Sequence, residues 1–334
     1  TTEIYTLSLH DALPISNDYI TSDNTLVFSG TLNTALQTNE RVQISLDGGT
    51  TWEDATTTGT TWSYDNIANT LIDGTHSTQV RIVDQADNTG ATASQTITID
   101  TTSPSTPSTP TSYEDNVGDI TSATSTASTT DDTAPGINVG TGLTDTPKLY
   151  VDGVEVAATY NSTTGTLTPD TPLTNGTYDF TYTLTDAAGN ESGESGALTI
   201  TIDTTSPTQT ITIDSITDDT GTAGDFITND NDGLTIGATL SAVLGVGEIL
   251  EYSNDNGLTW IDITSSVSGT DVSYADTALT STNTIQMRVS DGANYSTTTS
   301  QLITIDTTSP SIIVSTISDR SEEHTSELQS RQSI

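Results

Sequence analysis

The stretch TITIDTTSP decides the fold of this chain because it recurs at a fixed distance. It occupies residues 96–104, then 199–207, and returns as LITIDTTSP at 302–310. Its aspartates are Asp100, Asp203 and Asp306, each 103 residues after the one before. A period of this length is too long for one coil of a solenoid and suits one small globular domain. The sequence therefore predicts tandem domains of equal size.

The phase of the repeat sets the expected boundaries. We expect domains at residues 17–103, 104–206 and 207–309, followed by the start of a fourth repeat at residues 310–319. A strand that runs into a glycine turn recurs in phase as VQISLDGG, LYVDG and LEYSNDNG. A later strand that runs into a polar turn recurs as VRIVDQADNTG, YTLTDAAGNES and MRVSDGANYS. Compositional bias alone does not keep three such features in phase.

Each repeat is expected to be a β-sandwich. Apolar residues alternate with polar ones, as in Val42, Ile44 and Leu46, which indicates strands with one buried face. Asp-Gly and Asn-Gly pairs separate the strands, as in hairpin turns. About seven short strands in about 100 residues is the immunoglobulin-like pattern. The predicted fold class is all-β, with tandem immunoglobulin-like β-sandwich domains in an elongated array.

Disorder is the alternative to a folded array. A hydrophobic content of only 31% and an acidic, Thr-rich composition favour it. Against it, Ile, Tyr and Trp residues keep their alternation through the repeats. We expect Trp52, Trp62 and Trp260 to be core residues that lie under hairpins.

The two ends of the chain differ from the middle. The strings TEIYTLSLHDALPIS, residues 2–16, and RSEEHTSELQS, residues 320–330, resemble in-frame translations of the adapter oligonucleotides of short-read sequencing libraries. We therefore interpret residues 1–16 and 320–334 as adapter-derived artefacts and leave them out of the fold prediction. On this interpretation the first domain is truncated at its N-terminus and the chain is a fragment.

Composition excludes several classes of function. The chain has 45 Asp and Glu against six Lys and Arg, a formal net charge of −39, and this charge repels nucleic acid and anionic membrane surfaces. No apolar run is long enough to insert in a membrane. There is no cysteine, and no GxSxG, HExxH or P-loop motif. We expect a protein that is not an enzyme. Adaptation to high salt would also explain the acidity.

The strings IDTTSP, TDAAGNES and LDGGTTW resemble the bacterial Ig-like domains that form long arrays in giant Gram-negative surface adhesins, secreted by the type I route and active in biofilms. The resemblance covers residues 17–319. It implies an extracellular stalk segment that projects a binding head for adhesion or biofilm formation, with calcium at the domain junctions. The implied partners are neighbouring Ig-like domains of the same chain, and cell-surface or matrix ligands of regions outside this fragment. The glycine-rich GGxGxD repeats of such proteins are absent.

The topology of an Ig-like sandwich predicts where acidic residues converge. The last strand and the first loop meet at the exit end of a domain, where they face a turn of the next domain. Ca²⁺ takes six to eight oxygen ligands, mostly carboxylates and carbonyls. The predicted ligands are Asp100, Asp186 and Asn190 at the first junction; Asp203, Glu114, Asp115 and Asp291, with Asn294, at the second; and Asp306, Asp218 and Asp219 at the exit of the third domain. Asp131, Asp132, Asp230 and Asp232 would extend these sites.

Two other interpretations stay open at this point. Each Asp could simply close an Asx turn or lie solvated in a loop. The Thr-rich strands could instead form a ligand-binding module for carbohydrate or ice. One domain carrying a flat Thr patch that the others lack would favour that second function.

Overall fold

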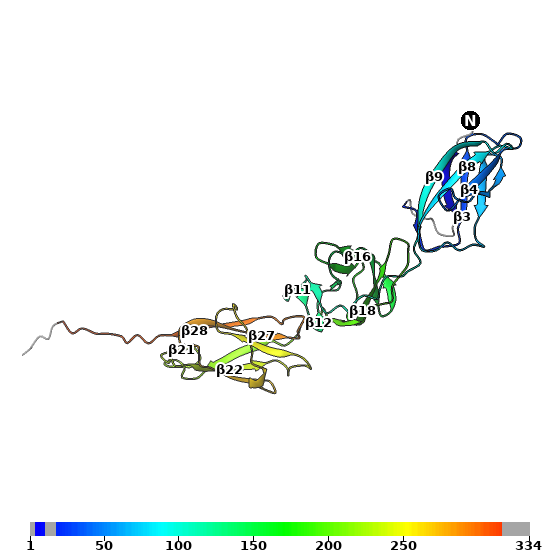
Figure 1. Ribbon diagram of the computed structural model, residues 1–334. Helices are drawn as coiled ribbons and strands as arrows, with labels where there is room; N and C mark the ends of the chain where they lie inside the picture. Colours follow the sequence, from blue (N-terminus) through cyan, green and yellow to red (C-terminus); the bar gives the residue numbers. More distant parts are fainter. Residues whose placement is uncertain (1–3, 11–17, 316–334) are drawn as a thin grey trace, which may run out of the picture. The chain divides into compact units, whose positions relative to one another are not determined.

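The computed structural model describes residues 4–10 and 18–315, with side chains from residue 18 onward. Almost all of its regular structure is β-strand, arranged as six sheets that pair into three sandwiches (Figure 1). The all-β fold with three tandem immunoglobulin-like domains is thereby confirmed. The chain separates into two compact units, one reaching Thr205 and including residues 292–294, and one that begins at Ser206. In the described part, no helix is long and apolar enough to cross a membrane.

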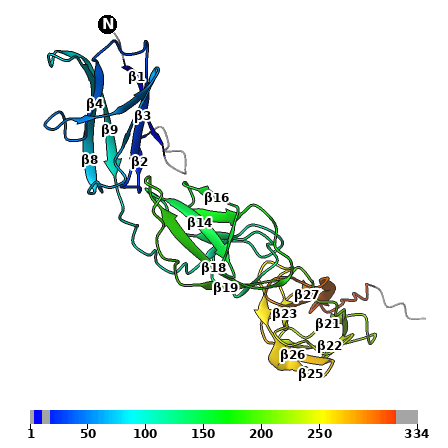
Figure 2. The same cartoon turned by 90° about the vertical axis from the view of Figure 1, so that its right-hand side faces the viewer.

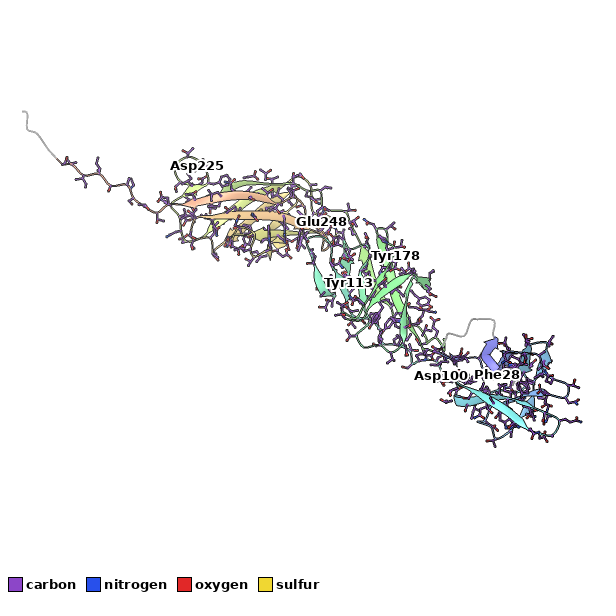
Figure 3. The ribbon with its side chains drawn as sticks, turned by 90° about the horizontal axis from the view of Figure 1, so that it is seen from above. Phe28, Asp100, Tyr113, Tyr178, Asp225 and Glu248 are labelled. Carbon is purple, nitrogen blue, oxygen red and sulfur yellow. The ribbon has the colours of Figure 1, made fainter. Side chains whose placement is uncertain are left out.

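The first sandwich packs a four-stranded sheet on a five-stranded one. The first sheet runs β1 (Ile4–His10), β3 (Val27–Leu32), β7 (Thr61–Asp65) and β6 (Thr56–Thr58). The second runs β2 (Ile20–Thr21), β9 (Thr89–Ile99), β8 (Gly74–Val83), β4 (Arg41–Ser45) and β5 (Glu53–Asp54). Alternate residues of these strands fill the core, among them Ile44, Trp62 and Phe28. Phe28 is labelled in Figure 3.

The segment Ile4–His10, which we interpret as adapter-derived, forms β1 and pairs antiparallel with β3. A strand at the edge of a sheet offers unpaired N–H and C=O groups to any extended segment. The origin of residues 1–16 therefore stays a prediction. Residues 1–3, 11–17 and 316–334 lie outside the described residues. They include residues 316–319 of the predicted start of a fourth repeat and all of the second adapter-like segment.

The second sandwich has two five-stranded sheets (Figure 2). One runs β11 (Ser122–Ser125), β10 (Tyr113–Asp115), β13 (Gly136–Asn138), β17 (Thr166–Pro169) and β16 (Ala158–Asn161). The other runs β12 (Thr129–Thr130), β19 (Leu198–Ile202), β18 (Gly176–Thr185), β14 (Thr146–Val151) and β15 (Val154–Val156). Tyr113, Leu149 and Phe180 are fully buried between them.

The third sandwich repeats the plan of the first. One sheet runs β20 (Ile211–Ile216), β22 (Leu234–Leu240), β26 (Asp271–Asp276) and β25 (Val267–Ser268). The other runs β21 (Ile227–Thr228), β28 (Thr299–Ile305), β27 (Asn283–Ser290), β23 (Ile249–Ser253) and β24 (Ile261–Asp262). A single 3₁₀ turn, η1 (Thr264–Ser266), is the one helical element in the described part of this domain.

The three tryptophans do not have the same role. Trp62 is 2% exposed and lies in the first core, as predicted. Trp52 and Trp260 are only half-buried, so that prediction was wrong for both. Each indole lies over a hairpin glycine and carries an arginine on its face: Arg81 stands 3.8 Å from the Trp52 ring centroid and Arg288 stands 4.0 Å from that of Trp260. An arginine over the ring replaces the apolar cover that a core would give.

An aspartate fixes each of these two hairpins. The carboxylate of Asp47 accepts hydrogen bonds from the backbone N–H and the hydroxyl of Thr51, and Asp255 accepts the same pair from Thr259. Hydrogen bonds to the ionised form favour it, and they lower the pKa of Asp47 to about 2, with the Thr51 hydroxyl as the largest cause. The Thr259 hydroxyl has the same effect on the pKa of Asp255, which is also about 2.

We expect the double variant D47N/D255N to melt below the unaltered chain at pH 7. A carboxylate with a lowered pKa contributes stability that is fully present above its unfolded value of 3.8 and is lost as the pH falls through about 2. The difference in melting temperature should therefore shrink as the pH falls from 4 to 2. The control E155Q removes an exposed acid and should show no such trend. A difference that stays constant with pH would contradict this account.

Candidate functional site

The aspartates that close the three domains make the same backbone hydrogen bond. Asp100, Asp203 and Asp306 directly follow the last strands β9, β19 and β28. Each donates its backbone N–H to a buried threonine carbonyl at the end of a short strand that runs parallel to the last one: to Thr21 at 3.0 Å, to Thr130 at 2.8 Å and to Thr228 at 2.8 Å. The repeated sequence thus produces a repeated domain end.

The side chain of the same threonine reaches the first loop of its domain. Thr130 Oγ1 donates to Asp115 Oδ2 at 2.8 Å, and Thr228 Oγ1 donates to the carbonyl of Asp218. Asp115 therefore lies at the same end of the second domain as Asp203. Asp218 likewise lies at the same end of the third domain as Asp306. Glu114 neighbours Asp115 on β10, and successive residues of a strand point to opposite faces, so the two side chains do not converge.

These threonines escaped the sequence analysis, although the sequence carries a signal for them. The string Thr-x-Asp occurs at 21–23, 130–132 and 228–230. In each copy the threonine hydroxyl accepts a hydrogen bond from the aspartate N–H two residues later, at 3.1 Å or less. The motif is short and degenerate in so Thr-rich a chain, and this is why only its tertiary contacts reveal it.

The first loop of the second domain encloses three acidic residues, Asp115, Asp131 and Asp132, which we call the loop cluster of this domain. Asp115 and Asp132 are 4% and 3% exposed, and Asp131 Oδ1 is buried without a hydrogen-bond partner among the described residues. Burial raises the pKa of Asp115, and the neighbouring Asp132 adds to the shift. Burial also raises the pKa of Asp131, followed by the charge of Asp115. The negative charge of this cluster is therefore costly without a cation.

The chain packs tightly against the loop cluster at Gly118. This residue has φ +73°, and a Cβ added there would lie 1.8 Å from Asp131 Oδ2. The backbone closes over the carboxylate only because position 118 has no side chain.

The third domain has a related group of acids, Asp218, Asp219, Asp230 and Asp232, which we call its loop cluster. Asp219 Oδ2 accepts the N–H of Gly224 at 2.7 Å, and Asp219 Oδ1 is buried without a partner among the described residues. A hydrogen bond and the charge of Asp230 raise the pKa of Asp232, with a smaller contribution from Asp218. Each of the two domains thus has one buried carboxylate oxygen without a partner among the described residues, on Asp131 after β12 in the second domain and on Asp219 after β20 in the third.

The carboxylates do not converge on a single point. Among the residues whose side chains the structure describes, no three His, Cys, Asp or Glu form a group that could hold a metal ion. The loop clusters supply the oxygen chemistry of a calcium site through their unsatisfied oxygens, but not a closed coordination shell.

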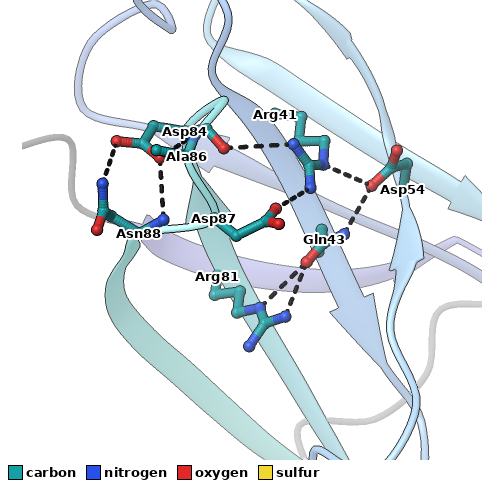
Figure 4. A network of polar contacts seen from close by, with 8 residues as sticks. All are labelled: Arg41, Gln43, Asp54, Arg81, Asp84, Ala86, Asp87 and Asn88. Carbon is teal, nitrogen blue, oxygen red and sulfur yellow. Dashed lines mark hydrogen bonds and ion pairs between the residues drawn. The ribbon is translucent and has the colours of Figure 1, made fainter.

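In the turn before the last strand, an aspartate carboxylate accepts hydrogen bonds from an asparagine of the same turn. In the first domain Asp84 accepts the backbone and side-chain N–H groups of Asn88 at 2.9 and 2.8 Å (Figure 4). In the second domain Asp186 accepts the corresponding pair from Asn190, both at 2.9 Å. This is an Asx-type closure of the loop, and it engages both oxygens of the predicted ligand.

Asn190 also reaches the preceding repeat. Its Nδ2 donates to the backbone carbonyl of Asp100 at 2.7 Å, while Ser22 donates its N–H to the carbonyl of Ala188 at 3.1 Å. The first compact unit repeats the contact where Asn294 Nδ2 donates to the carbonyl of Asp203 at 2.8 Å. The predicted neighbours Asp100 and Asn190 therefore meet through an amide donor, whereas a calcium ion would need an oxygen there. Asp291 belongs to the second unit.

The linker after each closing aspartate is tied to its own domain. Asp73 accepts the Thr101 hydroxyl at 2.8 Å and the Thr102 hydroxyl at 3.1 Å. In the second domain Asn175 accepts the Thr204 hydroxyl at 2.9 Å and donates to Thr205 Oγ1 at 3.1 Å. The two threonines of IDTTSP are therefore hydrogen-bonded to the domain that they follow.

A family model described as "Bacterial Ig-like domain" matches residues 3–101 and 106–204. The chain belongs to this family, and the two matches agree with the repeat period that the sequence shows. No curated protein sequence matches the chain.

Three solved structures resemble the chain at low identity and with low overall superposition. The chicken CNTN1 FN1–FN3 domains are 11% identical, cover 91% of this chain and 98% of their own, and give a TM-score of 0.31. The Clostridium thermocellum CbhA fibronectin(III)-like modules are 11% identical, cover 59% and 94%, and give 0.33. A tetra-tandem repeat in the extending region of a large adhesion protein is 17% identical, covers 90% and 74%, and gives 0.23.

Proposed function

We propose that this chain is a non-enzymatic stalk segment of an extracellular bacterial adhesin, which projects a binding head from the cell surface for adhesion or biofilm formation. The observation that carries the proposal is the repeated domain end. Each closing aspartate is anchored to a threonine of its own domain, and two of the linkers that follow are tied down by hydrogen-bonded threonines. Domain ends that are built in the same way, each leading into the next domain, suit a spacer between a cell surface and a binding head.

Calcium is the second part of the proposal. We expect Ca²⁺ to bind at the loop clusters of the second and third domains, near the closing aspartates Asp203 and Asp306. The support is chemical: Asp131 Oδ1 and Asp219 Oδ1 are buried carboxylate oxygens with no hydrogen-bond partner in the part of the chain that the structure describes. A hard dication would satisfy such oxygens and offset the repulsion among neighbouring acids. Binding to the folded state alone would stabilise it by mass action.

The full chain should become more stable and stiffer in calcium. We expect a higher melting temperature and a larger radius of gyration by small-angle X-ray scattering in millimolar calcium than in chelator. Magnesium at the same concentration controls for ionic strength, since Mg²⁺ demands a stricter octahedral geometry. Identical melting curves and scattering profiles with calcium and with chelator would contradict the calcium proposal.

The variant D131N separates the loop cluster from general charge effects. Asp131 is half-buried, and its Oδ1 has no partner among the described residues. Removing its charge should therefore raise the melting temperature of the second domain in chelator and reduce its gain from calcium. E155Q removes one exposed acid of the same domain and should leave both values unchanged. Equal behaviour of the two variants would place calcium elsewhere on this acidic chain.

A further inference from the structure

The first domain carries an array of hydroxyl groups on the outer face of the sheet β3–β7–β6. Thr31, Thr56, Thr58, Thr61 and Ser63 are exposed, and Ser29 is half-buried. The strand registers align them in two rows of three. Ser63 lies opposite both Ser29 and Thr56, and Thr61 lies opposite both Thr31 and Thr58. Neighbouring strands lie about 4.8 Å apart, so each row is a regular line of hydroxyls.

The array lines a hollow. These six residues, with Gly30 and Trp62, enclose a volume of about 330 Å³. Volumes near this value are the lower end of those that small-molecule sites enclose. The six side chains around the space are all Ser or Thr, and they are too short to fill it. The hollow is therefore a consequence of short side chains on the outer face of this sheet.

The chemistry of the lining is neutral. None of its eight residues is charged, on a chain that has 45 acidic residues. The hydroxyls of Thr56, Thr58 and Ser63 make no hydrogen bond to another described residue, and each can both donate and accept. Trp62 also borders the hollow, but its indole packs in the core on the other face of the sheet. The hydroxyls are therefore the groups that a ligand in the hollow would meet.

The other two domains do not repeat the array. On β26 of the third domain the exposed positions include Asp271 and Ala275. On β16 of the second domain the exposed Thr159 donates its hydroxyl to Asp170 at 2.7 Å, so a carboxylate lies beside it. A feature that serves only to space domains has no reason to be confined to one of them.

We infer that the hollow on β3, β7 and β6 binds a neutral saccharide of a polysaccharide chain. A sugar ring presents hydroxyls that both donate and accept, as the lining does, and an uncharged ligand is not repelled by the acidic surface around the site. The second candidate for a regular hydroxyl array is ice. A concave hollow suits a ring better than the flat face of a crystal.

Affinity electrophoresis of the full chain tests the inference. Native gels would contain dextran, hydroxyethyl cellulose or galactomannan as neutral probes, and alginate as the anionic one. We expect retardation by at least one neutral probe and none by alginate. The variant T56V/T58V keeps the β-branched shape and removes two free hydroxyls, and it should weaken the apparent affinity about tenfold.

The control T75V/T96V removes two exposed hydroxyls from the other sheet of the same domain and should migrate as the unaltered chain does. No retardation by any neutral probe, or equal retardation of T56V/T58V, would overturn the inference. Shaping of ice crystals by the unaltered chain but not by T56V/T58V, without retardation in the gels, would also overturn it in favour of ice.

Discussion

Replacing Trp62 with alanine is expected to lower the free energy of unfolding of the first domain by about 3 to 5 kcal/mol. Trp62 is among the largest fully buried side chains, at 2% exposure, and packs with Phe28 and Ile44 in the first core. Alanine would leave a cavity that the surrounding strands fill only in part. Hydrogen exchange read peptide by peptide measures the effect, since it separates the three domains.

Trp52 provides the matched control in the same domain. It is half-buried and its packing comes from the hairpin and from Arg81. W52A should therefore cost only about 1 kcal/mol. If W52A and W62A destabilise the first domain equally, the assignment of Trp62 alone to the core is wrong.

Replacing Asp276 with alanine should lower the free energy of unfolding of the third domain by about 3 kcal/mol, because it leaves the donors of Tyr252 and Asn254 without their acceptor. Asp276 is 4% exposed, and its Oδ2 accepts from Tyr252 Oη at 2.9 Å and from Asn254 Nδ2 at 2.8 Å. Burial and the Asp276 carboxylate hold the pKa of Tyr252 above its usual range. Urea unfolding followed by the fluorescence of Trp260, the one tryptophan of this domain, measures the loss.

D271A on the same strand is the control for this prediction. Asp271 is exposed at the start of β26, and its removal should change stability by less than about 0.5 kcal/mol. The double variant D276A/Y252F should lose less than the two single variants added together, since it removes both ends of one hydrogen bond. Strict additivity would show that the bond between Asp276 and Tyr252 does not stabilise the domain.

The candidate site shows where sequence reasoning stops. The topology of the repeat predicted that Asp115 and Asp203 share a domain end, because strand order fixes which loops share an end, and in the structure both residues contact Thr130. It did not reveal that Asp186 closes its own turn. An aspartate that faces a neighbour and one that caps its own loop have the same letter and the same spacing. Calcium at these residues stays a prediction.

The sequence by itself determined the repeat, the all-β class and the length of one domain, because the period of TITIDTTSP and the two-residue apolar alternation are local and survive in a string of letters. Tertiary structure alone decided which side chains share a surface. Ser29, Ser63 and Thr56 form one row only through the registers of three strands. Trp52 and Trp62 stand ten residues apart, in the β4–β5 and β6–β7 hairpins, yet only Trp62 enters the core. Whether a side chain is buried depends on which residues of the opposite sheet pack against it, and these contacts join residues that are far apart in the sequence.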